Sequence, residues 1–436
     1  MGGGLLQLVA YGAQDVYLTG NPQITFFKAV YRRHTNFAIE AIQQTFNGSP
    51  NYGQRVTCTI ARNGDLIHRV YLVVDLSNIT NSLCKFIGLR LINYVEIEIG
   101  GQRIDKHYSH WLYIWNELSL PLSKKKGYYD MVGASGGVPG GTSSKLNKIL
   151  YIPLEFWFCR NVGLALPLIS LQYHEVKINI NFETAEKCKD ISASSFSGNF
   201  SASLWVDYIF LDTDERRRFA QLSHEYLIEQ LQFTGQESIT NTDIKPKLNF
   251  NHPCKELVWF VTHADANNNN WFNYTLNSTN STYNLKVKIG DSTDGLYTDT
   301  DIWYFVKKLK ESAINSINPI ANAKLVLNGN DRFAQRSGLY FNHVQPFQHH
   351  KNVPSNAGIN VYSFALKPEE HQPSGTLNMS RIDTAVLNLS MTPSVTYGTT
   401  TTSLTYNDGK YNLNVYAVNY NVLRIMSGMG GIAYSN

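Results

Sequence analysis

The sequence predicts an all-β protein built from two successive antiparallel β-sandwich domains. Its composition is 43% hydrophobic, 17% charged and 12% aromatic, a balance that favours sheets over helices and excludes a disordered chain. Short β-branched or alternating segments, bounded by turn residues, recur along the 436 residues. Three of these segments are echoed later in the same order, and a repeated order predicts one domain plan used twice. The length suits two such domains.

The individual strands are recognised by alternation and by the Gly, Asn, Asp and Pro residues between them. Helical periodicity is weak, and Trp111–Leu118 is the best short helix candidate. The clearest strand candidates are Arg55–Ile60, Val70–Leu76, Tyr94–Ile99, Val176–Phe182, Leu204–Leu211, Lys324–Leu327, Val386–Leu389 and Val415–Leu423.

The internal repeat consists of three pairs of similar segments. The pairs are Phe37–Gln43 with Tyr226–Gln232, Glu98–Gln102 with Val326–Asn330, and Val206–Leu211 with Val418–Leu423. The two members of the middle pair are farther apart in the sequence than those of the other two pairs. The second copy therefore carries extra residues before Lys324, in the region of the polar stretch Ala264–Asp301. We expect that stretch to be a long surface loop, like the glycine-rich stretch Gly133–Ser144 of the first copy.

No catalytic, cofactor-binding or metal-binding residue can be nominated. Gly133–Gly137 satisfies the G-x-S-x-G pattern, but that motif needs a strand before it and a helix after it, and this one lies in a glycine run. Two histidine pairs, His107 with His110 and His349 with His350, lack a third ligand at metal spacing. Gly428–Gly431 has no helix after it to hold a phosphate and is interpreted as a turn.

The charge and the cysteine content indicate neither nucleic-acid binding nor a disulfide framework. The net charge of +4 is mild and the basic runs are short, so solvated turns explain them better than a nucleic-acid track. The five cysteines are scattered and form no CxxC pair, which predicts free thiols in a reducing compartment. We expect neither a secretory signal nor a membrane helix, because no apolar run is long enough.

With these segments laid out, the chain closely resembles the double jelly-roll major capsid proteins of large icosahedral DNA viruses, especially those of the algal chloroviruses. The blocks that carry the resemblance span both halves and the segment between them. They are Val9–Glu40, Arg62–Ile67, Glu98–Tyr108, Gly163–Val176, Trp205–Gly235, Gln372–Asp383 and Asn419–Asn436. Three stretches match no pattern of the family and are candidate surface loops, namely Ser119–Leu150, Ala264–Ala323 and Thr384–Leu413.

The resemblance implies two tandem eight-stranded jelly rolls with long surface loops and few short helices. We expect an N-terminal anchoring segment at residues 1–24, a first jelly roll at 25–212, a charged linker at 213–224 and a second jelly roll at 225–436. The family also implies a non-enzymatic shell subunit that forms homotrimeric, pseudo-hexagonal capsomers in the virion. Neighbouring capsomers and minor capsid proteins are the implied partners, with synthesis in the host cytoplasm.

Two further expectations concern the surface. Asn273, Asn277 and Asn280 head N-x-[ST] sequons in a predicted exposed loop and are the candidate glycosylation sites. The segment Met1–Ile24 combines many apolar residues with turn formers, and leaving that apolar surface in water would cost about 25 cal/mol per Å². It is therefore expected to dock on its own first domain, a neighbouring subunit or an internal capsid component.

Alternatives from other classes remain. A carbohydrate-binding jelly-roll module would be one isolated domain with an aromatic or calcium-binding patch, and no acidic calcium loop is evident. An enzyme on a sandwich scaffold would need a convergent His, Asp and Glu set, which the sequence does not offer. A minor capsid paralogue is the third alternative.

Overall fold

The computed structural model describes residues 3–141, 146–191, 198–264, 268–275, 318–397, 400–403, 406 and 410–434. It divides into an N-terminal unit, Met1–Phe37, and a body, Ala38–Asn436. The described part of the N-terminal unit holds two short helices, α1 (Gly3–Val9) and α2 (Val16–Thr19), neither of which buries a side chain. All further elements belong to the body apart from Phe37, the first residue of β1.

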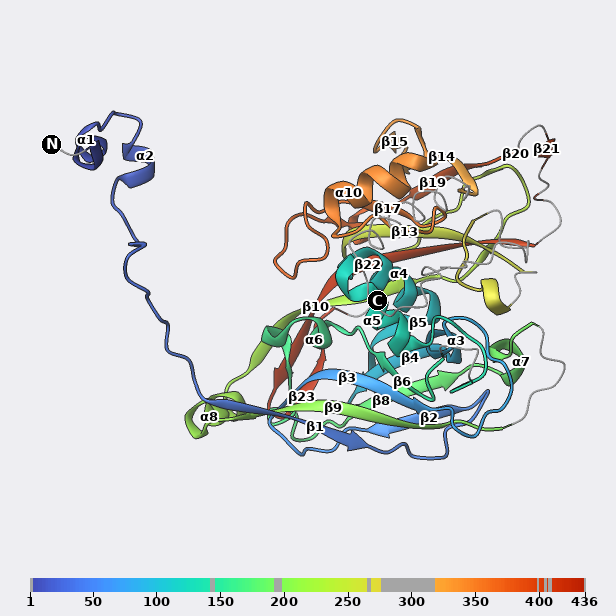
Figure 1. Cartoon of the computed structure of the whole chain (residues 1–436), viewed down its shortest axis with the longest axis horizontal. Helices are drawn as coiled ribbons and strands as arrows, with labels where there is room; N and C mark the ends of the chain where they lie inside the picture. Colours follow the sequence, from blue (N-terminus) through green and yellow to red (C-terminus); the bar gives the residue numbers. More distant parts are fainter. Residues whose placement is uncertain are drawn as a thin grey trace. The chain divides into compact units, whose positions relative to one another are not determined.

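The first sandwich consists of one five-stranded and one four-stranded antiparallel sheet, and its strands can be followed in Figure 1. One has the order β1-β9-β3-β6 and the other the order β2-β8-β4-β5, with the short β7 added beside β3. The strand bounds are β1 Phe37–Gln44, β2 Arg55–Thr59, β3 Leu66–Asp75, β4 Ile92–Ile99, β5 Gln102–Tyr108, β6 Ile149–Pro153, β7 Leu166–Pro167, β8 Val176–Phe182 and β9 Ser201–Leu211.

Alternation along these strands fills the space between the two sheets. Leu72 and Val74 of β3 and Leu204 of β9 are fully buried, as are Ile97 of β4 and Ile178 of β8. These side chains belong to one continuous apolar cluster. Because successive strand residues point to opposite faces, the residues between them face away from this core.

The second sandwich repeats the plan. One sheet has the order β10-β22-β13-β17, extended by β11, β18 and β23, and the other has the order β12-β19-β14-β15, with β16 beside β14. The bounds are β10 His224–Phe233, β11 Glu237–Ser238, β12 Asp243–Ile244, β13 Pro253–His263, β14 Ile320–Leu327, β15 Asn330–Asp331, β16 Arg336–Ser337, β17 Asn360–Ser363, β18 Leu377–Asn378, β19 Ala385–Met391, β22 Tyr411–Met426 and β23 Met429–Ile432. A hairpin, β20 (Ser394–Tyr397) and β21 (Thr400–Ser403), stands apart.

The two strand orders correspond position by position, which confirms the predicted tandem fold. The first echo forms β1 and β10, the outer strands that each begin a sheet order, and the third echo lies in β9 and β22, the strands next to them. The middle echo forms the β4–β5 turn and the β14–β15 turn. Six of the eight strand candidates fall within observed strands, and the other two, Arg55–Ile60 and Val70–Leu76, run one residue past the ends of β2 and β3.

The helices are longer and more numerous than the sequence predicts. The candidate Trp111–Leu118 is confirmed by α4 (Ser109–Ser119). However, α5 (Leu122–Val132) occupies part of Ser119–Leu150, where a surface loop is predicted, and buries Tyr128 and Val132. The predicted linker contains α8 (Thr213–Gln221), whose side chains are all at least partly exposed. Thr384–Leu413, predicted as a loop, includes the core strand β19.

The remaining helical segments are short. They are α3 Ile87–Leu91, α6 Trp157–Arg160, η1 Val162–Leu164, α7 Ala185–Cys188, η2 Asn268–Asn270, the π-helical η4 Tyr340–Val344, α10 Gln345–His349 and η5 Met379–Arg381.

Glycine is required at the β4–β5 turn. Gly100 has φ +58° and Gly101 has φ +83°, and L side chains rarely adopt such backbone conformations. A Cβ on Gly100 would lie 2.3 Å from Nδ1 of His174, whereas a Cβ on Gly101 would meet nothing within 4 Å. Gly428, at φ +79°, lies in the turn of the β22–β23 hairpin, so the interpretation of Gly428–Gly431 as a turn holds for Gly428, whereas the three residues after it belong to strand β23.

Candidate assembly surfaces

The junction between the two sandwiches is formed by α4 and β5 of the first and the sheet that contains β13 and β22 of the second. Alternate residues of this sheet belong to different apolar clusters. Trp259 and Ala417 pack in the second sandwich's own core, whereas Phe260 and Tyr416 join the cluster of the first sandwich. The sheet is therefore covered on both faces, by its own partner sheet and by the first sandwich.

Aromatic side chains carry the apolar part of this junction. The ring of Trp111 on α4 lies 5.7 Å from that of Tyr416, and the ring of His110 lies 5.3 Å from that of Phe260. Tyr108, at the end of β5, stacks on Tyr416 at 6.1 Å. Aromatic pairs at such distances add to the free energy of burial, by about 0.5–1.5 kcal/mol each.

Buried ions of both sandwiches meet at Glu229 of β10. Its two carboxylate oxygens lie 2.9 Å from Nη1 of Arg160, on α6 of the first sandwich, and 2.6 Å from Nζ of Lys255 on β13. The side chain of Lys255 is fully buried, and burial lowers the pKa of its ammonium group, with Glu229 opposing that effect. Arg160 also lies over the ring of Trp115 on α4.

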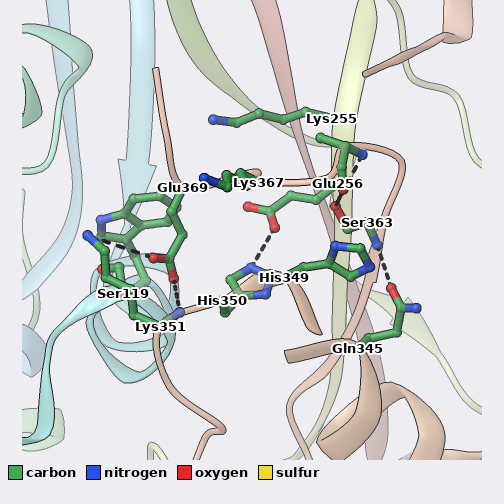
Figure 2. A network of polar contacts seen from close by, with 12 residues as sticks. Ser119, Lys255, Glu256, Gln345, His349, His350, Lys351, Ser363, Lys367 and Glu369 are labelled. Atoms are coloured by element: carbon green, nitrogen blue, oxygen red, sulfur yellow. Dashed lines mark hydrogen bonds and ion pairs between the residues drawn. The ribbon is translucent and has the colours of Figure 1, made fainter. Parts of the chain in front are cut away.

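A second buried pair involves Glu256, the residue that follows Lys255 in β13 (Figure 2). Nε2 of His350, which follows α10, is 2.8 Å from Oε2 of Glu256, and both side chains have no exposed surface. Burial by itself would raise the pKa of Glu256, but His350 and Lys255 outweigh it, so the pKa lies below its ordinary value. Nearby Glu369 accepts a hydrogen bond from the backbone N–H of Lys351, and burial raises its pKa.

A third polar cluster holds the end of α4 against a loop of the second sandwich. Oε2 of Glu117 accepts hydrogen bonds from Nζ of Lys125 and from Oγ of Ser355, each at 2.9 Å. The hydroxyl of Tyr129 donates to the other oxygen at 2.5 Å. Burial would raise the pKa of Glu117, but Lys125 and the two hydroxyls lower it below its ordinary value.

Between the sandwiches lies an open cleft of about 370 Å³. Arg160, Glu229 and Glu369 line it together with two histidines, His68 and His371. Its charges are largely satisfied within the chain, since Arg160 pairs with Glu229 and His68 bonds to the carbonyl of Phe158. Among the described residues, no group of three or more His, Cys, Asp or Glu is arranged to hold a metal ion.

Among the described residues of the body, two groups of neighbouring apolar side chains are exposed or half-buried on the surface. The first is the outward face of the sheet β1-β9-β3-β6, where Tyr71 stacks on Trp205 with ring centres 6.4 Å apart and lies 6.3 Å from Tyr151. Tyr151 is 44% exposed. The second surface lies at the start of η4 and on α10, where Leu339, just before η4, is 60% exposed and Phe347 on α10 is 79% exposed. An exposed apolar patch of this kind is typical of a binding surface.

The sequence motifs without an assigned role have structural explanations. Nε2 of His107 lies 2.9 Å from a carboxylate oxygen of Asp105, and Nδ1 of His110 forms a 2.9 Å hydrogen bond with the hydroxyl of Tyr274. Gly133 ends helix α5, so a helix precedes the G-x-S-x-G pattern where a nucleophile turn needs a strand. All five cysteines are free thiols, as predicted.

The candidate glycosylation sites stay predictions. Asn273 is partly buried, and its side-chain oxygen accepts hydrogen bonds from the N–H and the hydroxyl of Thr275. Asn277 and Asn280 lie outside the described residues.

The ion pair of the junction was not predicted from the sequence. Arg160 and Glu229 are 69 positions apart and carry no mutual spacing signal. One feature of the sequence could have indicated this pair. Glu229 places a charged side chain within the apolar pattern of the repeated segment Tyr226–Gln232, which is predicted to be a strand.

Comparisons with known proteins agree with this architecture. The family description "Large eukaryotic DNA virus major capsid protein" matches residues 215–431, and "Major capsid protein N-terminus" matches residues 25–212. The chain is 51% identical to a major capsid protein of Pyramimonas orientalis virus and 46% identical to one of Paramecium bursaria Chlorella virus 1. In both comparisons the match covers 100% of each chain.

Comparison with solved structures also finds capsid proteins. The chain resembles the PBCV-1 VP54 crystal structure fitted into a reconstruction of the virophage Sputnik, with a TM-score of 0.77, 42% identity and coverage of 94% of this chain and 100% of that one. A Faustovirus major capsid protein shares the fold at 13% identity, with a TM-score of 0.70 and coverage of 95% and 94%.

Together, the paired sandwiches and these matches define a double jelly-roll shell protein. The chain belongs to the major capsid protein family of large eukaryotic DNA viruses, and it is a structural capsid protein. Its curated relatives at these identities are named as capsid components, which favours a structural role over an enzymatic one. Within the described residues, no helix is long and apolar enough to cross a membrane.

Proposed function

We propose that this chain forms homotrimeric, pseudo-hexagonal capsomers that tile an icosahedral shell. The observation that carries the proposal is the correspondence of the two strand orders, β1-β9-β3-β6 with β10-β22-β13-β17 and β2-β8-β4-β5 with β12-β19-β14-β15. A trimer of a chain with two similar lobes presents six similar lobes, which suits hexagonal packing. The similarity to a protein of the "PBCV-1 virus capsid, quasi-atomic model", at 41% identity and a TM-score of 0.75, supports this reading.

We also propose that the domains divide as the sequence predicts, with jelly rolls at residues 25–212 and 225–436 joined by 213–224. The two sets of sheets support this division, because β9 ends at Leu211 and β10 begins at His224. The matched family descriptions, 25–212 and 215–431, change at nearly the same place.

The N-terminal segment, residues 1–24, is proposed to anchor the subunit within the shell. Its support is the exposure of its apolar side chains within the chain, including Tyr17 at 92% and Leu18 at 86%. Neighbouring capsomers and minor capsid proteins would be the partners in the virion, after synthesis in the host cytoplasm. A carbohydrate-binding module would be an isolated domain, whereas here two sandwiches share a buried junction.

Native mass spectrometry and sedimentation of the purified chain, with and without reducing agent, test the proposal. A trimer that persists in reducing agent is expected, because all five cysteines are free thiols within the chain and four of them are buried. A chain that remains monomeric at micromolar concentration across physiological salt would contradict it.

A further inference from the structure

Two of the free cysteines, Cys84 and Cys188, lie opposite each other in the first sandwich. Cys84 stands in the connection between β3 and α3, and Cys188 is the last residue of α7. The backbone N–H of Cys84 donates a 3.0 Å hydrogen bond to the carbonyl of Cys188. Their neighbours Leu83 and Lys189 form an isolated antiparallel bridge. The register of this bridge therefore sets the two cysteines directly across from each other.

Residues opposed in this way are spaced as a disulfide requires. Opposing residues of an antiparallel pair have Cα atoms about 4.5–5.5 Å apart, and a disulfide joins residues whose Cα atoms are roughly 4.4–6.8 Å apart. The side chain of Cys84 is also directed towards the other segment, because its Sγ lies 4.0 Å from the carbonyl oxygen of Lys187, the residue before Cys188. Both the backbone and the side chain thus favour a bond between these two sulfurs.

The other three cysteines are not aligned with one another. Strand pairing sets Cys58 of β2 opposite Ile178 and Cys254 of β13 opposite Asn419, and Cys159 belongs to the short helix α6. Backbone pairing in the described part of the chain therefore singles out one cysteine pair among the five thiols.

The two thiols share one buried environment. Neither residue has exposed surface, and burial raises the pKa of both thiols, to about 12 for Cys84. A charge on Cys84 raises the pKa of Cys188 further, whereas nearby Arg90 lowers the pKa of both. Because the thiolate is the reactive form, covered and protonated thiols of this kind react slowly. The pair is thus expected to stay reduced until the surrounding loops open.

Several segments meet around the pair. Leu83 exchanges two backbone hydrogen bonds with Gly137 of the glycine-rich stretch, at 2.9 and 2.8 Å. On the other side, Asn268 of η2 donates a 2.9 Å hydrogen bond to the carbonyl of Lys189. A covalent bond between the two cysteines would therefore fasten the β3–α3 connection to α7, where the glycine-rich stretch and the polar stretch of the second sandwich are both held.

We propose that Cys84 and Cys188 form an intrachain disulfide when the chain leaves a reducing compartment and meets a small-molecule disulfide such as oxidised glutathione. The thiolate of one cysteine attacks the small disulfide, which gives a mixed disulfide and releases one small thiol. The second cysteine then displaces the other small thiol. Two cysteine thiols thereby lose two protons and two electrons, and the reagent is reduced to two thiols that carry those protons. The inference does not depend on the proposed trimer, because both sulfurs belong to one chain.

Incubation of the reduced full-length chain with oxidised glutathione tests this proposal. After denaturation and alkylation with N-ethylmaleimide, three of the five cysteines should carry the reagent. Peptide mapping should find Cys84 joined to Cys188 in a peptide that separates on reduction. Because a disulfide restricts the unfolded chain, the oxidised protein should unfold at a temperature about 2–10 °C above that of the reduced protein, and dithiothreitol should reverse the change.

Single substitutions separate this pair from the other thiols. Cys84→Ala and Cys188→Ala should each abolish the joined peptide and the rise in unfolding temperature. Cys58→Ala, at another fully buried cysteine, is the matched control and should keep both.

Since the thiols are covered, the incubation is repeated with the parent chain in urea just below the unfolding transition, where loops open locally. Absence of the Cys84–Cys188 peptide under both conditions would overturn the proposal, as would a link to a different cysteine. An oxidised chain that unfolds at a lower temperature than the reduced chain would overturn it too, because the bond would then strain the fold.

Discussion

Arg160 of the first sandwich and Glu229 of the second form an ion pair of 2.9 Å across the junction, and the same carboxylate neutralises the buried Lys255. A buried ion pair adds little net stability relative to apolar packing, but removing one member leaves an uncompensated charge. We therefore expect the pair to favour one arrangement of the two sandwiches over others.

Glu229→Gln is expected to lower the free energy of unfolding by about 3–5 kcal/mol, because Lys255 would remain buried without a counterion. Denaturant unfolding measures the change. Glu225→Gln on the same strand is the matched control, since its partner Arg424 is exposed and such pairs contribute about 1 kcal/mol or less. Equal losses from both substitutions would contradict the role of Glu229.

Acid is expected to destabilise the junction through Glu117. Its pKa in the folded chain is below the ordinary value of 4.5, so its contribution to stability is present above that pH and is lost as the pH falls through the folded value. Glu117→Gln should therefore flatten the acid limb of the curve of unfolding free energy against pH. An unchanged acid limb would show that other carboxylates set it.

Glu369 should behave in the opposite direction. Burial raises its pKa, so the protonated form is favoured in the folded chain and stability is lost as the pH rises through the folded value. Glu369→Gln mimics the protonated form and keeps an oxygen that can accept the hydrogen bond from Lys351. The variant is expected to be more stable than the parent at neutral pH and similar at low pH. Unfolding temperatures of the variant and the parent at pH 4 and pH 7.5 test this expectation. A variant that unfolds at a lower temperature than the parent at pH 7.5 would contradict it.

The β4–β5 turn offers a paired test of backbone geometry. Gly101→Ala should cost about 1–2 kcal/mol, the cost of a left-handed residue with a side chain. Gly100→Ala should cost more, because its Cβ would also collide with the ring of His174. Chemical unfolding of both variants gives the difference, and equal losses would show that the ring moves aside freely.

Removing residues 1–24 tests the proposed anchor. The body should unfold at the same temperature as in the full chain, because the described helices of this segment bury no side chain. Shell assembly should fail or slow. A truncated chain that assembles like the parent would contradict the anchoring role. In the control, a Gly/Ser segment of equal length replaces residues 1–24, so that the loss of apolar side chains is tested without a change in chain length.

Most of the fold could be predicted from the sequence because strand periodicity and turn residues are local features of the chain. The repeated order of three segments also predicted which strands take equivalent places in the two sandwiches, as β1 and β10 do. Helix α5 was missed since its lysine run, Lys124–Lys126, and Gly127 give little apolar periodicity, and it is held by Tyr128 and Val132 packing on the first core.

The junction could not be predicted because its partners come from distant parts of the chain. His350 and Glu256 are 94 positions apart, and Asn352 meets the backbone of α4 across more than 200 positions. The adjacent histidines His349 and His350 illustrate the difficulty, because one bonds to a backbone carbonyl while the other is fully buried beside a carboxylate.

The short helical connection α8, which joins β9 to β10, changes the kinetic order of assembly. In the proposed six-lobed trimer, it would make half of the sandwich contacts intramolecular, at an effective concentration far above that of free subunits. Closing the proposed ring would then require the encounter of three molecules in place of six, so the yield of capsomers would fall with the third power of dilution. Such a subunit would begin to assemble at a lower concentration than two separate single-sandwich chains.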